Sequence, residues 1–273
     1  MIRFGLALLA LMIPILAAAE TPPAPSVAPL LYAQLLQRYV VPAAGEGEAA
    51  ESRFDYARFH AWEGQEEFRR GLRVTFLSVD PGALDAETRV VWAINTYNFL
   101  VIDLVTENFL PADEDTLASI GDIGEGGFAV FDQELFTVVG NAYSLNSFER
   151  HFLFLDPDRD AGKVSPELDP RLHFALVCAA KGCPPLLADA YRPAQLEMQI
   201  DAVTRQALRS ARHLQVADGR VRTGQVFAWY AADFQHVDGG IPGFLREYGP
   251  GGLPEEAFEP AADIEWDWSL NRP

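Results

Sequence analysis

The stretch DAETRVVWAINTYNFLVIDLVTENFL, residues 85–110, carries the strongest helical pattern in the sequence. Asp85 is a suitable N-cap, apolar residues then recur at helical spacing, and Pro111 ends the run. The segment is apolar on nearly all of its faces, which predicts a buried helix at the centre of the fold. Asn95 and Asn98 share one face of this helix. Because buried amides must be hydrogen-bonded, the pair either ties the helix to a loop or donates to a ligand oxygen in a pocket.

Shorter patterns on both sides of this helix predict a mixed architecture. Two hairpins are expected, over 135–145 with a turn at Gly140-Asn141 and over 213–224 with a turn at Asp218-Gly219. Amphipathic or short helices are expected over residues 30–40, 147–155, 194–211, 226–234 and 241–249. Few hairpins among many helices favour an α+β fold: one helix-rich domain over residues 53–273 with a small antiparallel sheet built from hairpins.

The N-terminus predicts the compartment. Arg3, an apolar run over residues 4–16 and a small-residue site at Ala17–Ala19 are typical of a secretory signal peptide over residues 1–19. Residues 20–52 would then form a Pro-rich leader and a first helix. We therefore expect a periplasmic or secreted protein with no membrane association after cleavage. The net charge of -18 argues against a nucleic-acid partner.

Both cysteines lie in HFALVCAAKGCPPL, residues 173–186. A disulfide needs Cα atoms about 4.4–6.8 Å apart, which five steps of strand or helix do not provide. A turn centred on Lys181-Gly182 is therefore expected between Cys178 and Cys183. In an oxidising compartment the pair can close, although so short a loop contributes only about 2 kcal/mol to stability. Alternatively, Cys178 is a free nucleophile activated by a neighbour such as His173.

An acidic segment, DPDRDAGKVSPE at residues 156–167, resembles a calcium-binding loop. Its carboxylates alternate as hard oxygen ligands do, but Ala161 stands where such loops carry glycine. The sequence thus predicts either a calcium site or a solvated acidic loop. The candidate metal ligands are Asp156, Asp158, Asp160 and Glu167.

Four motifs in order, NTYNFL, YSLNSFE, DPRLHFALVCAAKGCPPL and DWSLN, resemble those of a bacterial and plant family, domain-of-unknown-function family 547. The resemblance spans roughly residues 85 to 271 and implies no particular activity. It groups the following polar residues: Asn95, Asn98, Glu149, His173, Cys178 and Cys183.

Three functional hypotheses follow for a pocket built around Cys178. The first is cysteine-dependent acyl transfer or hydrolysis of a peptide-like amide, with Cys178 as nucleophile, His173 as base and Glu149 orienting the histidine. Asn95, Asn98, Lys181 and Cys183 would then contact the substrate.

The second hypothesis is a non-catalytic binding or scaffold domain with a Cys178–Cys183 disulfide. The third is a thiol-redox module that captures small thiols such as glutathione as mixed disulfides. None of the three requires an organic cofactor, and each takes a small molecule or a peptide as its ligand. The sequence leaves the choice between them, and the oligomeric state, open.

Overall fold

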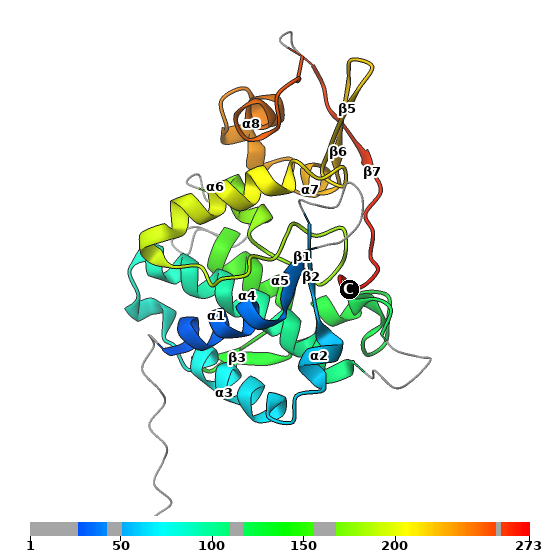
Figure 1. The fold of residues 1–273 in the computed structure, drawn as a ribbon. Helices are drawn as coiled ribbons and strands as arrows, with labels where there is room; N and C mark the ends of the chain where they lie inside the picture. The colour runs from blue at the N-terminus through cyan, green and yellow to red at the C-terminus, as the bar shows by residue number, and fades with distance from the viewer. Residues whose placement is uncertain (1–26, 43–50, 110–116, 155–167, 255–257) are drawn as a thin grey trace, which may run out of the picture.

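The computed structural model describes residues 27–42, 51–109, 117–154, 168–254 and 258–273. Two clusters of buried hydrophobic side chains divide the molecule into two regions, which we name the body and the cap. The body holds the larger cluster and the long helices, in the lower part of Figure 1. The cap, residues 208–254 and 258–264, holds most of the smaller cluster and lies in the upper part, with helix α6 between the two.

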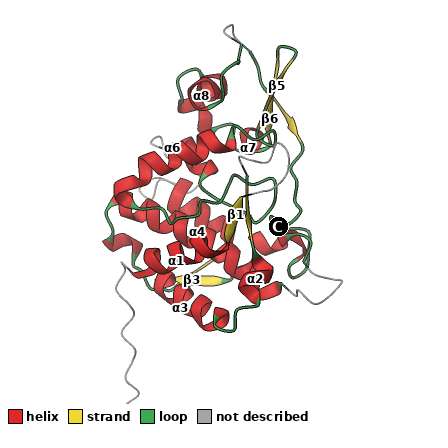
Figure 2. Cartoon of the chain, in the orientation of Figure 1, coloured by secondary structure: helices red, strands yellow, loops and turns green. Residues whose placement is uncertain are grey.

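The body is mainly helical, as the red ribbons of Figure 2 show. Short 3-10 turns and one π-helical turn connect its helices. Its elements are α1 Val27–Tyr39, β1 Val40–Pro42, β2 Ser52–Phe54, α2 Tyr56–His60, α3 Gln65–Leu77, α4 Ala86–Asn108, β3 Phe136–Val138, β4 Asn141–Tyr143, α5 Leu145–Glu149 and the π-helical η4 Arg150–Phe154.

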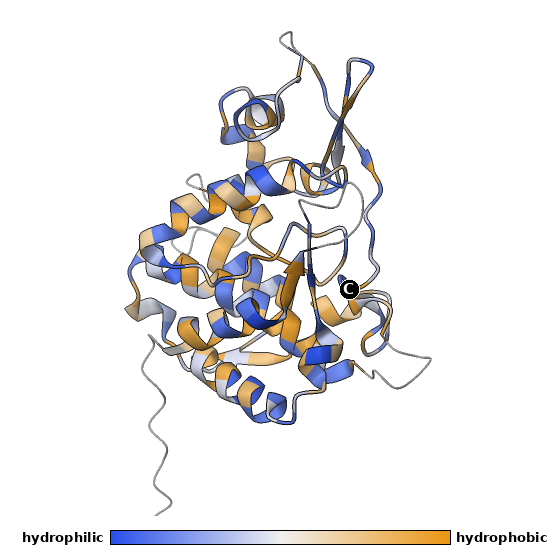
Figure 3. Ribbon diagram, viewed as in Figure 1, coloured by the Kyte–Doolittle hydropathy of each residue, from blue (hydrophilic) through white to orange (hydrophobic). Residues whose placement is uncertain are grey.

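Helix α4 lies at the centre of the body, as its sequence predicts. The Asp85 carboxylate accepts the Thr88 backbone N–H at 2.9 Å and caps the helix. Almost every side chain from Val91 to Val105 is buried, and the orange colour of Figure 3 runs through this part of the molecule. Burying apolar surface on nearly all faces of this helix stabilises the body, because the free energy gained scales with the apolar area removed from water.

The cap combines short helices with a three-stranded sheet. Its elements, with the connecting helix, are α6 Leu196–Ala207, β5 Leu214–Ala217, β6 Arg220–Gly224, α7 Val226–Trp229, η7 Asp233–His236, α8 Gly240–Tyr248 and β7 Ala261–Ile264. Phe174 enters the cap from the body and stacks on Phe244 with ring centroids 5.7 Å apart. The body and the cap are therefore joined by shared packing rather than by a linker.

The helix-rich α+β class is confirmed, with two differences in the strands. The 135–145 hairpin turns at Val139-Gly140, because Val138 pairs with Asn141; the expected turn was one residue later. Both turn residues have left-handed φ angles, 47° and 81°. The second hairpin turns at Asp218-Gly219 as expected, but β7 then joins β6 in parallel, so the sheet is not wholly antiparallel.

Some predictions concern segments outside the described residues. The signal peptide, most of the Pro-rich leader and the end of the 85–110 run at Pro111 belong to this group. Within residues 20–52, expected as a leader and a first helix, residues 40–42 and Ser52 belong to strands β1 and β2. No helix in the described ranges is long and apolar enough to cross a membrane.

Candidate functional site

Cys178 and Cys183 form a disulfide, with Cα atoms 6.1 Å apart. The expected turn lies between them: the Cys183 N–H donates to the Ala180 carbonyl at 3.1 Å across Lys181-Gly182. Ala179 takes a left-handed φ of 61°, an uncommon conformation for a residue with a side chain. A tight, partly strained loop thus brings the two sulfurs together.

The two sulfurs of the bridge have different surroundings. Cys183 is buried at 7% exposure, and its Sγ accepts the backbone N–H groups of Cys178 at 3.1 Å and Ala180 at 3.2 Å. Cys178 is part-buried and lines a cavity. The disulfide therefore presents one sulfur to the cavity and holds the other among backbone donors.

Helix α4 positions the chain that leads into this loop. The Asn98 side chain donates to the Ala175 carbonyl at 2.9 Å and accepts the Val177 N–H at 3.0 Å. Asn95 makes the same pair of hydrogen bonds with the backbone of Tyr191, both at 2.9 Å. Both amides are fully buried and occupied by backbone groups, and neither lines the cavity. The structure thus gives both asparagines the tying role; donating to a ligand oxygen would require breaking these bonds.

The segment from Trp266 to Asn271, here called the C-terminal strap, runs along the disulfide loop. The Gly182 N–H donates to the Asp267 carbonyl, the Lys181 N–H to Ser269 and the Asn271 N–H to Ala179, each at 2.8 Å. Gly182 has little room for a side chain, because an added Cβ would lie 2.8 Å from the Trp266 ring. The strap thereby fixes Trp266 and Trp268 beside Cys178.

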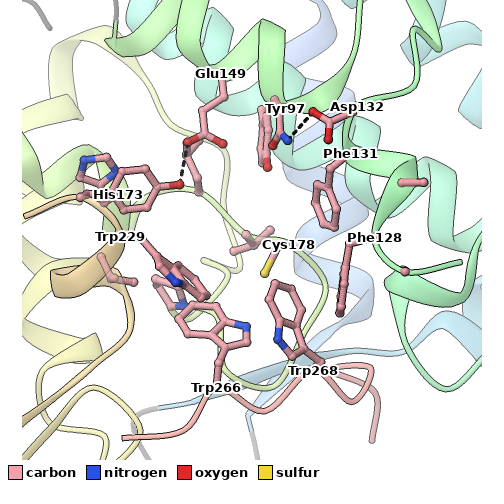
Figure 4. Close-up of a pocket in the computed structure, with 18 residues that line it drawn as sticks. Tyr97, Phe128, Phe131, Asp132, Glu149, His173, Cys178, Trp229, Trp266 and Trp268 are labelled. Carbon is pink, nitrogen blue, oxygen red and sulfur yellow. Dashed lines mark hydrogen bonds between the residues drawn. The ribbon is translucent and has the colours of Figure 1, made fainter. Parts of the chain in front are cut away.

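A cavity of about 480 Å³ opens between the body, the cap and the strap. This volume is in the range of small-molecule sites. Figure 4 shows Cys178 in the middle of the cavity, with Glu149 and Tyr97 on one side and the tryptophans on the other. Its lining comprises Tyr97, Gly127, Phe128, Ala129, Phe131, Asp132, Asn146, Glu149, His173, Leu176, Val177, Cys178, Pro184, Val226, Trp229, Tyr230, Trp266 and Trp268.

One wall of the cavity is an aromatic cluster. The centroid of the Trp229 ring lies 4.8 Å from that of Trp266 and 6.1 Å from that of Trp268. Phe128 packs on Trp268 with a centroid distance of 4.3 Å. Phe128 and Trp229 keep 36% and 49% of their surface exposed, so this wall continues to the surface. Exposed aromatic surface at the mouth of a cavity is typical of a binding site.

Glu149, at the end of α5, is the buried carboxyl of the cavity. It accepts a hydrogen bond from the Tyr230 hydroxyl at 3.2 Å and a second from Tyr97. Burial raises the pKa of Glu149 from 4.5 to about 7, although both hydroxyls and Arg150 act in the opposite direction. Glu149 therefore exchanges a proton near neutral pH.

His173 has a different partner from the one expected. Its Nε2 lies 2.8 Å from the Asp233 carboxylate, while its ring stacks between Phe154 and Tyr230 with centroids 4.3 Å and 3.9 Å away. Burial lowers the pKa of His173, against the opposing effect of Asp233. Glu149 and His173 thus both line the cavity with Cys178, but the carboxylate that orients the histidine belongs to η7.

The remaining predicted site residues lie elsewhere. Lys181 is in the disulfide turn and does not line the cavity. Asp156, Asp158, Asp160 and Glu167 lie outside the described residues. Within the described ranges, no group of three or more His, Cys, Asp or Glu side chains is arranged to hold a metal ion.

Sequence reasoning did not select the aromatic wall, the two tyrosines or Asp233. A signal for the wall existed, because Trp266 and Trp268 flank Asp267 at the start of the DWSLN motif. Asp233 carried no comparable signal: it lies 60 positions from His173, in a short helical segment.

The fold and the site define an α+β domain in which a disulfide lines an aromatic cavity. A family model matches residues 81–207, with the description Protein of unknown function, DUF547. The match supports the family suspected from the motifs; it contains the first three of them, and the fourth, DWSLN, lies outside it. No curated protein and no solved structure matches the chain. The cap and the strap both follow the matched segment, although both line the cavity.

Proposed function

We propose that this chain is an exported thiol–disulfide exchange domain, in which Cys178 forms mixed disulfides with a small thiol that enters the cavity. The observation that carries the proposal is the asymmetry of the bridge. Cys178 lines the cavity, whereas Cys183 is buried and its sulfur accepts two backbone N–H groups. An incoming thiolate can therefore reach one sulfur in preference to the other.

The exchange step balances without an added oxidant. The thiolate attacks Cys178 Sγ and forms a new S–S bond; the Cys178–Cys183 bond breaks, and its electron pair leaves on Cys183 Sγ as a thiolate. The N–H groups of Cys178 and Ala180 stabilise that charge, because hydrogen bonds to a thiolate lower its pKa and a less basic thiolate leaves faster. A second thiol can then attack the mixed disulfide, which releases a small disulfide and leaves both cysteines reduced.

The test is to treat the oxidised protein with 2-mercaptoethanol, quench with acid and locate the adduct by peptide mass. We expect the adduct on Cys178. The two single-cysteine variants have no bridge, so they are treated with hydroxyethyl disulfide instead. Cys178 in Cys183→Ser should displace 2-mercaptoethanol and keep the adduct, because no second thiolate remains to reverse the step, whereas the buried Cys183 in Cys178→Ser should not form it. An adduct on Cys183, equal adducts on both, or an inert bridge would overturn the proposal; the last result would favour the non-catalytic scaffold.

Cysteine-dependent acyl transfer is the second candidate, favoured by Glu149, a carboxyl in the same cavity with a pKa near 7. It requires the reduced protein. Alkylation rates of Cys178 in reduced wild type, Glu149→Gln and His173→Ala measure whether either residue activates the thiol. Equal, slow labelling in all three proteins would exclude an activated thiolate.

Export rests on the signal-peptide pattern of residues 1–19. We expect the mature chain to begin near Glu20 in a periplasmic or secreted fraction. N-terminal sequencing checks this, and protein from that fraction that still begins with Met1 would contradict it.

A further inference from the structure

The cavity is acidic as well as aromatic. Its acidic lining groups are the carboxyls of Glu149 and Asp132; among the described residues that line it, none is lysine or arginine. Asp132 is exposed and accepts a hydrogen bond from Asn146 at 2.9 Å. The only other titratable groups of the lining are His173, which Asp233 engages, and the hydroxyls of Tyr97 and Tyr230.

The aromatic wall opposite these carboxyls suits a positive charge. Trp229, Trp266 and Trp268 present three indole rings within about 6 Å of one another, with Phe128 beside them. An ammonium group over an aromatic face is attracted by the negative face of the ring, most strongly for tryptophan. The same wall gives no preference to an anion, which the carboxyls and the net charge of -18 would repel.

We infer that the cavity binds an organic ammonium group between the tryptophans and Glu149. For the exchange proposed at Cys178, this site makes the substrate an aminothiol rather than an acidic thiol; that assignment, unlike the ammonium site itself, rests on the exchange proposal. The ammonium end would lie among the indole rings and carboxyls, and the sulfur would face Cys178, which lines the same cavity (Figure 4).

Binding can be tested without thiol chemistry. The oxidised protein is titrated by calorimetry with choline and with 3,3-dimethyl-1-butanol, in which carbon replaces the charged nitrogen, at constant ionic strength. We expect choline to bind about tenfold more tightly, as one favourable cation–π and carboxylate site provides. Glu149→Gln should lose most of this preference, and Glu134→Gln, at an exposed carboxylate outside the cavity, should keep it. Equal affinity for the two probes, or no binding of choline, would overturn the inference.

The exchange rate supplies the second arm. The rates at which cysteamine, 2-mercaptoethanol and mercaptoacetate form the adduct on Cys178 are measured at equal thiolate concentration. Each rate is divided by the rate of the same thiol with hydroxyethyl disulfide, which corrects for the intrinsic reactivity of the thiol. We expect cysteamine to react with Cys178 about tenfold faster than mercaptoacetate, and this ratio to fall in Glu149→Gln. Equal normalised rates for cysteamine and mercaptoacetate would overturn the aminothiol assignment while leaving the exchange proposal in place. Binding of choline without any adduct would remove the exchange proposal and the aminothiol assignment, and leave the ammonium site.

Discussion

Asp103 and Glu149 are two buried carboxyls of the body, and their hydrogen-bond donors differ in kind. Asp103, on α4, is 1% exposed and forms ion pairs with Arg69 at 2.6 Å and Arg73 at 2.5 Å, both from α3. Glu149 is 9% exposed and has two tyrosine hydroxyls as its hydrogen-bond donors. One carboxyl is neutralised by charge; the other is held by neutral donors beside a cavity.

The difference separates a carboxyl that is used within the fold from one that faces the cavity of the proposed site. The guanidinium groups satisfy Asp103 and join α3 to α4, so its charge is used within the fold. The charge of Glu149 is not cancelled by a buried cation among the described residues of the cavity, and its pKa is about 7. A carboxyl that burial makes costly to ionise would be stabilised in its charged form by a cationic ligand beside it.

The largest expected effect comes from removing the carboxylate of Asp103, the one paired with arginines. Asp103→Ala leaves Arg69 buried without its partner and should lower the free energy of unfolding by about 3–5 kcal/mol. Urea denaturation measures the change. Asp201→Ala is the matched control, because its ion pair with Arg205 is well exposed and should be worth at most about 1 kcal/mol. Equal losses in the two variants would remove the distinction.

The second effect has the opposite sign and depends on pH. Between pH 4.5 and about 7 folded Glu149 keeps a proton that the unfolded chain has released, so its contribution to stability falls as pH rises through this window and is level above it. Glu149→Gln cannot ionise. Its gain over wild type should grow from near zero at pH 4 to as much as about 3 kcal/mol at pH 8.

Thermal or urea unfolding from pH 4 to 8 measures this difference between the two proteins. Other buried groups that titrate here, such as His173 and His213, are present in both and cancel. Glu134→Gln provides the baseline for an exposed carboxylate. A gain in the free energy of unfolding of Glu149→Gln that is constant with pH, or a loss at pH 8, would contradict the raised pKa of Glu149.

A smaller effect should sharpen the role of the tyrosines. Tyr97→Phe removes a donor to Glu149 and should cost about 1 kcal/mol. Because that hydrogen bond lowers the pKa of Glu149, its loss should move the midpoint of the pH dependence upward. The same substitution in the Glu149→Gln protein is the control: because glutamine does not titrate, this protein should show no Glu149-dependent midpoint. An unchanged midpoint in the single variant would show that the hydroxyl does not act on the carboxyl.

The smallest expected effect concerns the exposed carboxyl of the cavity. Asp132→Asn should leave the free energy of unfolding within about 0.5 kcal/mol of wild type, as is usual for a surface position. Choline affinity should fall about two- to fivefold, in line with an exposed ionic interaction. Calorimetry and urea denaturation on one preparation check both. A loss of choline affinity larger than that of Glu149→Gln would show that Asp132, and not Glu149, contributes more to binding the ammonium group.

The sequence predicted those parts of the fold that depend on neighbours along the chain. Helix α4 and its Asp85 cap follow from spacing alone, and the Asp218-Gly219 turn follows from residues that accept left-handed φ angles. The first hairpin was displaced because burial decides its register: Val138 is 1% exposed, and Val139 is left in the turn with an exposed side chain. The parallel pairing of β6 with β7 joins distant segments and has no local signal.

The site divides in the same way. The need for a turn between Cys178 and Cys183 follows from the reach of five residues, and the turn is present. The common cavity of Glu149, His173 and Cys178 depended on motif resemblance, since Glu149 comes from a different segment than the other two. The partner of His173 could not be derived, because a carboxylate 60 positions away is one of many candidates in a chain with 39 acidic residues.

The C-terminal strap determines when the site comes into being as the chain folds. Asn271 accepts the Phe54 N–H and the Tyr56 hydroxyl, and Tyr56 is 215 positions away. Contacts across such loops form late, because closing them costs entropy before they are rewarded. Cys178 and Cys183, five positions apart, face no such delay. The bridge can thus be oxidised in a chain that still lacks the wall of Trp266 and Trp268, so the proposed selectivity among thiols would be acquired after the bridge has closed.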